Sequence, residues 1–120
     1  MSNKRREGFF GEEIAVNYLK SLNYQIIRRN YYTPYGEIDI IAKERECYIF
    51  VEVKLRRSKA YGHPLEQLPQ KKRERLIQSA QLYLEENKIT KCDWRFDYIT
   101  LLLSGETYKV THLKNAIEQN

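Results

Sequence analysis

The chain has 120 residues, of which 42% are hydrophobic and 31% are charged, and its net charge is +5. This length suits one domain over 1–120, and this composition excludes a disordered chain. No apolar run approaches the roughly 20 residues of a membrane span, and the first residues lack the apolar stretch of a secretory signal, so we expect a cytoplasmic protein without membrane contact. Cys47 and Cys92 form no close-spaced pair, which argues against a disulfide framework or a zinc knuckle.

Hydrophobic periodicity predicts two helices and five strands. In chain order these are a helix over 7–22, strands over 24–29, 37–42 and 47–56, a helix over 69–87, and strands over 95–103 and 108–113. Residues 30–35 are expected to form a loop around Pro34. The order α-β-β-β-α-β-β predicts an α/β (α+β) fold, in which helices flank a mixed β-sheet.

Two carboxylates interrupt the apolar pattern of the second and third predicted strands. Asp39 lies between two isoleucines and Glu52 between two valines, and burying an isolated charge is costly. Only four polar residues join these strands, which predicts an antiparallel hairpin that brings Asp39 close to Glu52. Two adjacent carboxylates repel unless a cation lies between them, and such oxygen ligands favour Mg²⁺ or Mn²⁺. A buried salt bridge is the alternative for Asp39.

Three further side chains are candidates for the same site. Lys54 projects from the same strand face as Glu52, about 7 Å away, so both can reach one substrate phosphate. On the first helix, Glu12 lies on the apolar stripe whereas Glu13 lies nearer its flank, and we therefore prefer Glu12. Glu37 shares the face of Asp39 by strand alternation, but it ranks lower because the first strand residue after a glycine is often solvated.

Basic and aromatic residues gather near these acids. The candidate phosphate contacts are Lys71, Lys72, Arg73 and Arg75 at the start of the second helix, and Arg56, Arg57 and Lys59 after the third strand. A solvated helix face is the alternative for the helical group. Tyr31, Tyr32 and Tyr35 could stack on unpaired bases, or they could pack against neighbouring strands. His63 in a later loop could approach the site.

These residues, in this order and spacing, resemble the YraN family, a branch of the restriction-endonuclease-like superfamily. The matching segments cover nearly the whole chain and are Gly11-Glu12, Asn30, Gly36 to Ala42, Phe50 to Lys54, Tyr61-Gly62, the helix start at Lys72, and Arg95-Phe96-Asp97. The resemblance implies a PD-(D/E)XK core similar to that of archaeal-type Holliday junction resolvases. Ile38 stands where the superfamily motif has proline.

The resemblance also implies roles for the candidate residues. Asp39 and Glu52 would hold Mg²⁺ (or Mn²⁺), with the Val53 carbonyl as a further ligand. Lys54 would position or help deprotonate the attacking water, and Glu12 would support this metal or hold a second one. Lys72 falls at a lysine that recurs in the family.

The expected function is that of a metal-dependent endonuclease that hydrolyses DNA phosphodiester bonds, on branched or damaged DNA. Because junction resolvases cut symmetrically, a homodimer is also expected. Two alternatives remain open from the sequence. One is a non-catalytic nucleic-acid-binding module that retains the nuclease fold, and the other is a scaffold protein with an ion-pair network at the hairpin.

Overall fold

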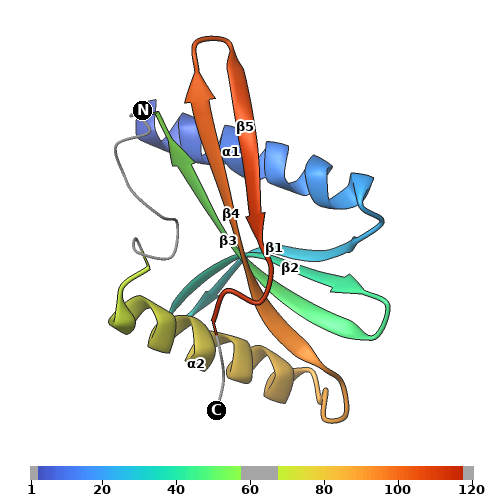
Figure 1. The fold of residues 1–120 in the computed structure, drawn as a ribbon. Helices are drawn as coiled ribbons and strands as arrows, with labels where there is room; N and C mark the ends of the chain where they lie inside the picture. Colours follow the sequence, from blue (N-terminus) through green and yellow to red (C-terminus); the bar gives the residue numbers. More distant parts are fainter. Residues whose placement is uncertain (1–2, 58–67, 118–120) are drawn as a thin grey trace.

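The computed structural model describes residues 3–57 and 68–117, with side chains from Phe10 onward. Its elements are α1 (Asn3–Ser21), β1 (Gln25–Thr33), β2 (Gly36–Glu44), β3 (Cys47–Arg56), α2 (Gln70–Glu86), β4 (Trp94–Ser104) and β5 (Thr107–Leu113). The predicted order and the mixed α+β fold are confirmed (Figure 1). No helix in these described ranges is long and apolar enough to cross a membrane.

The first strand is longer than predicted, and the loop expected over 30–35 is wrong. β1 continues to Thr33, and only Pro34 and Tyr35 form the turn before β2. The Thr33 hydroxyl accepts the N–H groups of Tyr35 and Gly36, at 3.0 and 3.1 Å, and so closes this turn. Pro34 therefore marks a two-residue turn rather than the middle of a longer loop.

The five strands form one sheet in the order β1-β2-β3-β4-β5. The predicted hairpin is confirmed, because β2 pairs antiparallel with β3 from Ile40–Val51 to Glu44–Cys47. β3 pairs parallel with β4, whereas β4 and β5 are antiparallel. A parallel neighbour requires a crossover connection, and α2 lies in the segment between these two strands.

The two helices cover opposite faces of the sheet, and each buries its own core (Figure 1). The core under α1 includes Ile14, Ala15, Leu19, Ile40, Ala42, Ile49, Val51, Ile99 and Leu101. The core under α2 includes Ile38, Ile41, Phe50, Leu76, Ala80, Tyr83, Phe96 and Tyr98. Consecutive residues of β3 belong to alternate cores, which confirms the alternation predicted for that strand.

This alternation breaks in β2 at Asp39. Ile38 belongs to the α2 core and Ile40 to the α1 core, although two residues of a regular strand should share a face. The pairing between β2 and β3 also ends at Ile40 and Val51. Asp39 therefore lies where two strands diverge and where the layers of both helices meet.

Candidate functional site

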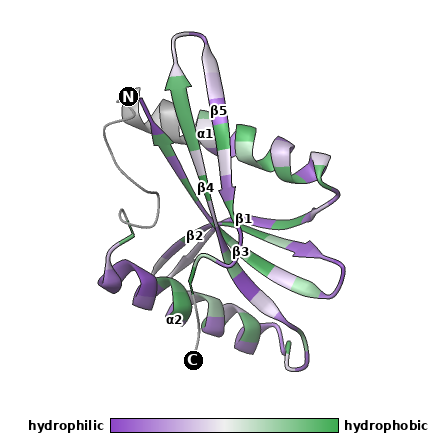
Figure 2. Ribbon diagram, in the orientation of Figure 1, coloured by the Kyte–Doolittle hydropathy of each residue, from purple (hydrophilic) through white to green (hydrophobic). Residues whose placement is uncertain are grey.

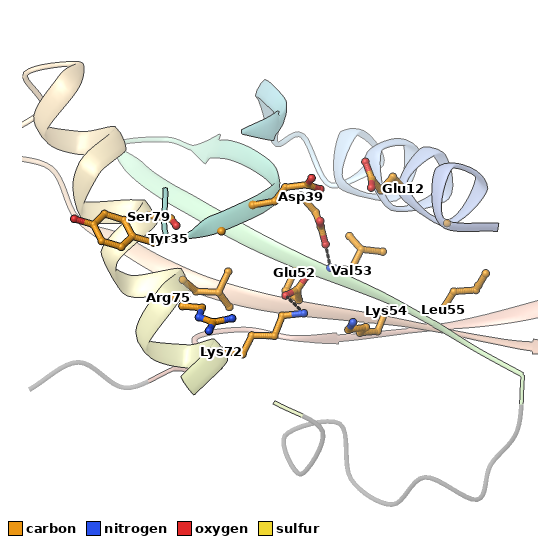
Figure 3. Close-up of a pocket in the computed structure, with 14 residues that line it drawn as sticks. Glu12, Tyr35, Asp39, Glu52, Val53, Lys54, Leu55, Lys72, Arg75 and Ser79 are labelled. Atoms are coloured by element: carbon orange, nitrogen blue, oxygen red, sulfur yellow. Dashed lines mark hydrogen bonds and ion pairs between the residues drawn. The ribbon is translucent and has the colours of Figure 1, made fainter. Parts of the chain in front are cut away.

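A cavity of about 430 Å³ lies at this divergence and draws its walls from four elements. Its size is within the range of small-molecule and nucleotide sites. The residues that line it are Gly11 and Glu12 of α1, Tyr35, Gly36, Glu37 and Asp39 at the start of β2, Glu52 to Leu55 of β3, and Lys72, Arg75, Leu76 and Ser79 of α2. The cavity thus collects most of the candidate site residues predicted from the sequence (Figure 3).

Asp39 is held by the end of the neighbouring strand. Its Oδ2 accepts the N–H of Val53 at 2.9 Å, just beyond the last paired residues of β2 and β3 (Figure 3). Burial raises the pKa of Asp39 far above its ordinary value, and the hydrogen bond and charge of Glu52 raise it further, while the Val53 N–H opposes this. The Asp39 carboxyl therefore keeps a proton at neutral pH when only these groups surround it.

Glu52 is the most buried acid of the cavity. Glu52 is 7% exposed. The Lys72 Nζ lies 2.9 Å from its Oε2, so an ion pair neutralises the buried carboxylate. A buried charge needs such a partner, because burial of an unpaired carboxylate is costly.

Glu12 and Glu37 complete the acidic wall. One carboxylate oxygen from each of Glu12, Glu37 and Asp39 lies within 4.8 Å of the other two. Asn30 holds two of these groups, since its Nδ2 donates to Glu12 at 2.9 Å and to Glu37 at 3.3 Å. Burial raises the pKa of Glu12, and the charge of Glu37 adds to this effect.

The preference for Glu12 over Glu13 agrees with this geometry, because Glu13 pairs instead with Arg29. The low rank given to Glu37 disagrees with this geometry, because Glu37 is one of the three acids whose carboxylate oxygens lie within 4.8 Å of one another. Strand alternation with Asp39 was the signal that could have raised it. Sequence reasoning did not assign a role to Asn30, whose φ of 53° within a strand is a conformation that asparagine tolerates better than most residues.

Lys54 lies in the cavity beside Glu52, as predicted. Burial lowers the pKa of Lys54, and the charge of Lys72 lowers it further, whereas Glu52 opposes this. A lysine with a lowered pKa releases its proton more readily than a solvated one.

The donor set of the cavity suits a hard divalent cation. Glu12, Glu37, Asp39 and Glu52 offer only oxygen, and Mg²⁺ and Mn²⁺ prefer carboxylate oxygen over nitrogen or sulfur. Glu52 does not belong to the group of three acids whose oxygen atoms lie within 4.8 Å of one another, and its Oε2 is paired with the Lys72 ammonium. Val53 contributes its N–H to Asp39, and a role for its carbonyl as a ligand stays a prediction.

The predicted basic residues divide into groups. Lys72 and Arg75 line the cavity, and Lys71 is exposed on the same turn of α2. Arg73 instead binds the residues before α2, because its Nε donates to the Leu68 carbonyl at 2.9 Å.

After β3, the charge of the half-buried Arg56 acts on Lys54, and Arg57 is exposed. Lys59 and His63, together with Tyr61 and Gly62 of the predicted family match, lie outside the described residues.

The three tyrosines of the predicted loop differ in exposure. Tyr31 is buried in the α2 core and its hydroxyl donates to Glu86 at 2.6 Å, so the packing alternative holds for it. Tyr32 is 72% exposed and Tyr35 is 44% exposed. Of these three, Tyr35 lines the cavity, where an aromatic ring can meet a base.

Comparison with known proteins identifies relatives over nearly the whole chain. Residues 11–101 match the uncharacterised protein family UPF0102. A UPF0102 protein of Alkaliphilus oremlandii (strain OhILAs) is 44% identical over 114 residues, which cover 93% of this chain and 97% of that protein. UPF0102 proteins of Caldicellulosiruptor saccharolyticus and Clostridioides difficile (strain 630) are 40% and 41% identical, over 95% of this chain and 98% of each relative.

Proposed function

The chain belongs to the UPF0102 family, the family also called YraN, and from the geometry of its acidic cavity we propose that it is a divalent-metal-dependent endonuclease that hydrolyses DNA. The observation that carries this proposal is the meeting of four carboxylates and Lys54 in one cavity, where three of the acids have oxygen atoms within 4.8 Å of one another. The membership of a PD-(D/E)XK superfamily implied by the sequence resemblance is part of the proposal.

In this mechanism the acids form a cation site in two parts. Asp39 and Glu52 would hold the cation from β2 and β3, with further oxygen atoms close to Asp39 from Glu12 and Glu37. When bound, Mg²⁺ or Mn²⁺ supplies Lewis-acid polarisation of the phosphodiester and lowers the pKa of water. Asn30 positions Glu12 and Glu37 through its two hydrogen bonds. As a ligand Asp39 would be a carboxylate, with its proton released to solvent.

Lys54 acts on the water and on the developing charge. Its lowered pKa makes proton release easier than for a solvated lysine, and the neutral amine would take a proton from the attacking water. Once protonated, the same group stabilises negative charge on the pentavalent phosphorus centre. Arg75 and Lys72 lie on the α2 wall of the cavity, where their charges can attract the substrate phosphates.

The test is cleavage of DNA with purified protein. Linear, nicked, flapped and four-way DNA, incubated with Mn²⁺ or Mg²⁺, should yield cut products with the wild type. Glu52→Ala and Lys54→Ala should abolish cutting, while circular dichroism and DNA binding remain close to wild type. Glu13→Gln and Lys20→Ala, which change the same residue types outside the cavity, should cut normally.

Two outcomes would reject this function. Retained cutting in both Glu52→Ala and Lys54→Ala would eliminate the mechanism. DNA binding by the wild type without cutting under any metal would favour the alternative, a nucleic-acid-binding module that keeps the nuclease fold.

A further inference from the structure

Lys72 lies where a cation bound to Oε2 of Glu52 would be. Its Nζ is 2.9 Å from this oxygen (Figure 3). An ammonium and a divalent cation repel strongly when both lie against one buried oxygen, because the low dielectric of the site screens them weakly. A metal ligated by Glu52 therefore requires Lys72 to leave.

We propose that Lys72 is the resident counter-ion of Glu52 in the metal-free protein, that a divalent cation displaces it, and that the released ammonium then binds a substrate phosphate. This inference rests on the proposed function, since it assumes a cation at Glu52. It adds an order of events: the metal binds first and thereby makes available the lysine that recruits the substrate.

The two partners differ in how freely they can move. The Glu52 side chain is 8% exposed on a paired strand, whereas the Lys72 side chain is 36% exposed near the start of α2. A long lysine side chain can turn toward solvent without movement of the helix backbone. Glu52 has no comparable freedom, so Lys72 is the partner that leaves.

The surroundings favour a phosphate as the second partner of Lys72. Lys54 lies close enough to Lys72 for their charges to act on each other, and Arg75 follows three residues after Lys72 on the same helix face. Three cationic groups at one wall repel one another once Glu52 is occupied by a metal. A phosphate relieves this repulsion because it accepts hydrogen bonds from several cations at once.

The first experiment measures Mn²⁺ affinity by electron paramagnetic resonance, without DNA. Lys72→Met should lower the Kd for Mn²⁺ by about fivefold or more, because no counter-ion has to be displaced from Glu52. Lys71→Met removes the same charge from the exposed neighbour and should change the Kd by less than about twofold. An unchanged or raised Kd in Lys72→Met would overturn the exchange.

The second experiment uses the wild type and needs no variant to fold. Acylation of each lysine by acetic anhydride is quantified by mass spectrometry with and without Mg²⁺. Lys72 should react faster when Mg²⁺ is present, because its ammonium has left Glu52, whereas the rate at Lys71 should stay constant. Equal rates at Lys72 under Mg²⁺ saturation would contradict the proposal.

The two hypotheses fail in different ways. If the wild type binds Mn²⁺ and Lys72→Met binds it no more tightly, the exchange is wrong and the nuclease proposal stands. If neither folded protein binds Mn²⁺, the proposed metal site itself is wrong, and the inference falls with it.

Discussion

A buried carboxyl group destabilises a protein unless a partner neutralises it, and Asp39 is such a group. Burial and the neighbouring Glu52 raise its pKa, whereas the Val53 N–H acts in the opposite direction. A folded-state pKa above the unfolded value means that the native protein binds this proton more tightly. Stability from Asp39 is therefore complete below the ordinary aspartate pKa and is lost as the pH rises toward the raised value.

We predict that Asp39→Asn stabilises the metal-free protein at pH 8. The amide keeps an oxygen for the Val53 N–H and carries no titrating proton, so the free energy of unfolding should rise by about 1 kcal/mol, as is common when a functional site is neutralised. Urea unfolding at pH 5 and pH 8 measures this. The gain should be smaller at pH 5, because proton loss from Asp39 in the unfolded chain has by then destabilised the wild type less than at pH 8.

The effect of metal on the melting temperature completes this test of Asp39. Mn²⁺ should raise the melting temperature of the wild type and leave that of Asp39→Asn nearly unchanged. Glu13→Gln, which removes a surface ion pair with Arg29, should show the wild-type response to Mn²⁺. A destabilised Asp39→Asn with no metal effect in either protein would point to the scaffold alternative.

Asp97 is a second buried acid, but its environment stabilises the charge. It is 1% exposed and bonds with Arg95 Nε at 2.9 Å, with His112 Nε2 at 2.7 Å and with the Asn115 N–H at 3.1 Å. Burial alone would raise the pKa of Asp97, but the hydrogen bonds of His112 and Arg95 outweigh burial and lower it. This network ties β4 to β5 and does not reach the acidic cavity.

Asp97→Ala should cost about 3 kcal/mol or more at pH 7, because it removes the buried carboxylate that pairs with both Arg95 and His112. A lowered folded-state pKa means that this stability is present above the ordinary aspartate pKa and disappears as the pH falls through the folded value. The difference between wild type and variant in urea unfolding should therefore narrow at acidic pH. Asp93→Ala, an exposed neighbour, should stay within about 0.5 kcal/mol of the wild type.

At the scale of elements, the positive charge at the start of α2 serves the cavity but disfavours the helix itself. Its first turn contains Lys71, Lys72 and Arg73 and no acid, although the N-terminal end of a helix disfavours positive charge. Figure 2 shows this hydrophilic start of α2 beside a more apolar continuation. Of these three, Lys72 lines the cavity, where its charge neutralises that of Glu52.

The irregular backbone at Asn30 of β1 also serves the cavity. Asn30 adopts a φ of 53° inside the strand and turns its amide toward Glu12 and Glu37. We predict that Asn30→Gly, which tolerates this backbone conformation but lacks the amide, raises the Kd for Mn²⁺ by about tenfold, as loss of a ligand-orienting group does. Calorimetric titration of the folded variant with Mn²⁺ measures this change.

Asn23→Gly is the matched control, because Asn23 has a φ of 68° at the end of α1 and does not line the cavity. It should leave the Kd for Mn²⁺ at the wild-type value. Equal affinity in Asn30→Gly and Asn23→Gly would show that Asn30 does not position the acids.

The sequence predicted the elements whose pattern is regular and missed those whose pattern is interrupted. β3 alternates cleanly, so its faces, the hairpin with β2 and the positions of Glu52 and Lys54 followed from it. β1 contains the irregular Asn30 and ends at Pro34, and both residues suggested a loop. The strand forms nevertheless, because Tyr31 is buried under α2 and this packing overrides local preference.

Contacts between distant elements were beyond sequence reasoning. The spacing of Lys72 in α2 shows a basic run but cannot show that its ammonium meets Glu52 of β3. Glu37 ranked low for the same reason, since its proximity to Glu12 depends on how α1 docks on the sheet. Periodicity reports which face a residue occupies, whereas the partner across the fold is set by tertiary packing.

At the scale of the whole molecule, the cavity joins both layers of the fold. Glu12 comes from the helix on one face, Lys72 and Arg75 from the helix on the other, and the remaining acids from the sheet between them. Two separate cores hold these layers in place, so the position of the acids depends on both. The net charge of +5 adds a general attraction for a polyanion such as DNA.

The proposed function requires this cavity to bind a divalent cation through its carboxylates. An anomalous difference map from a crystal of the protein soaked in Mn²⁺ tests this requirement. We predict a peak within ligand distance of Asp39 and Glu52, with the Lys72 ammonium moved away from Glu52 Oε2. A map with no peak in the cavity at saturating Mn²⁺, and with Lys72 still paired with Glu52, would contradict it.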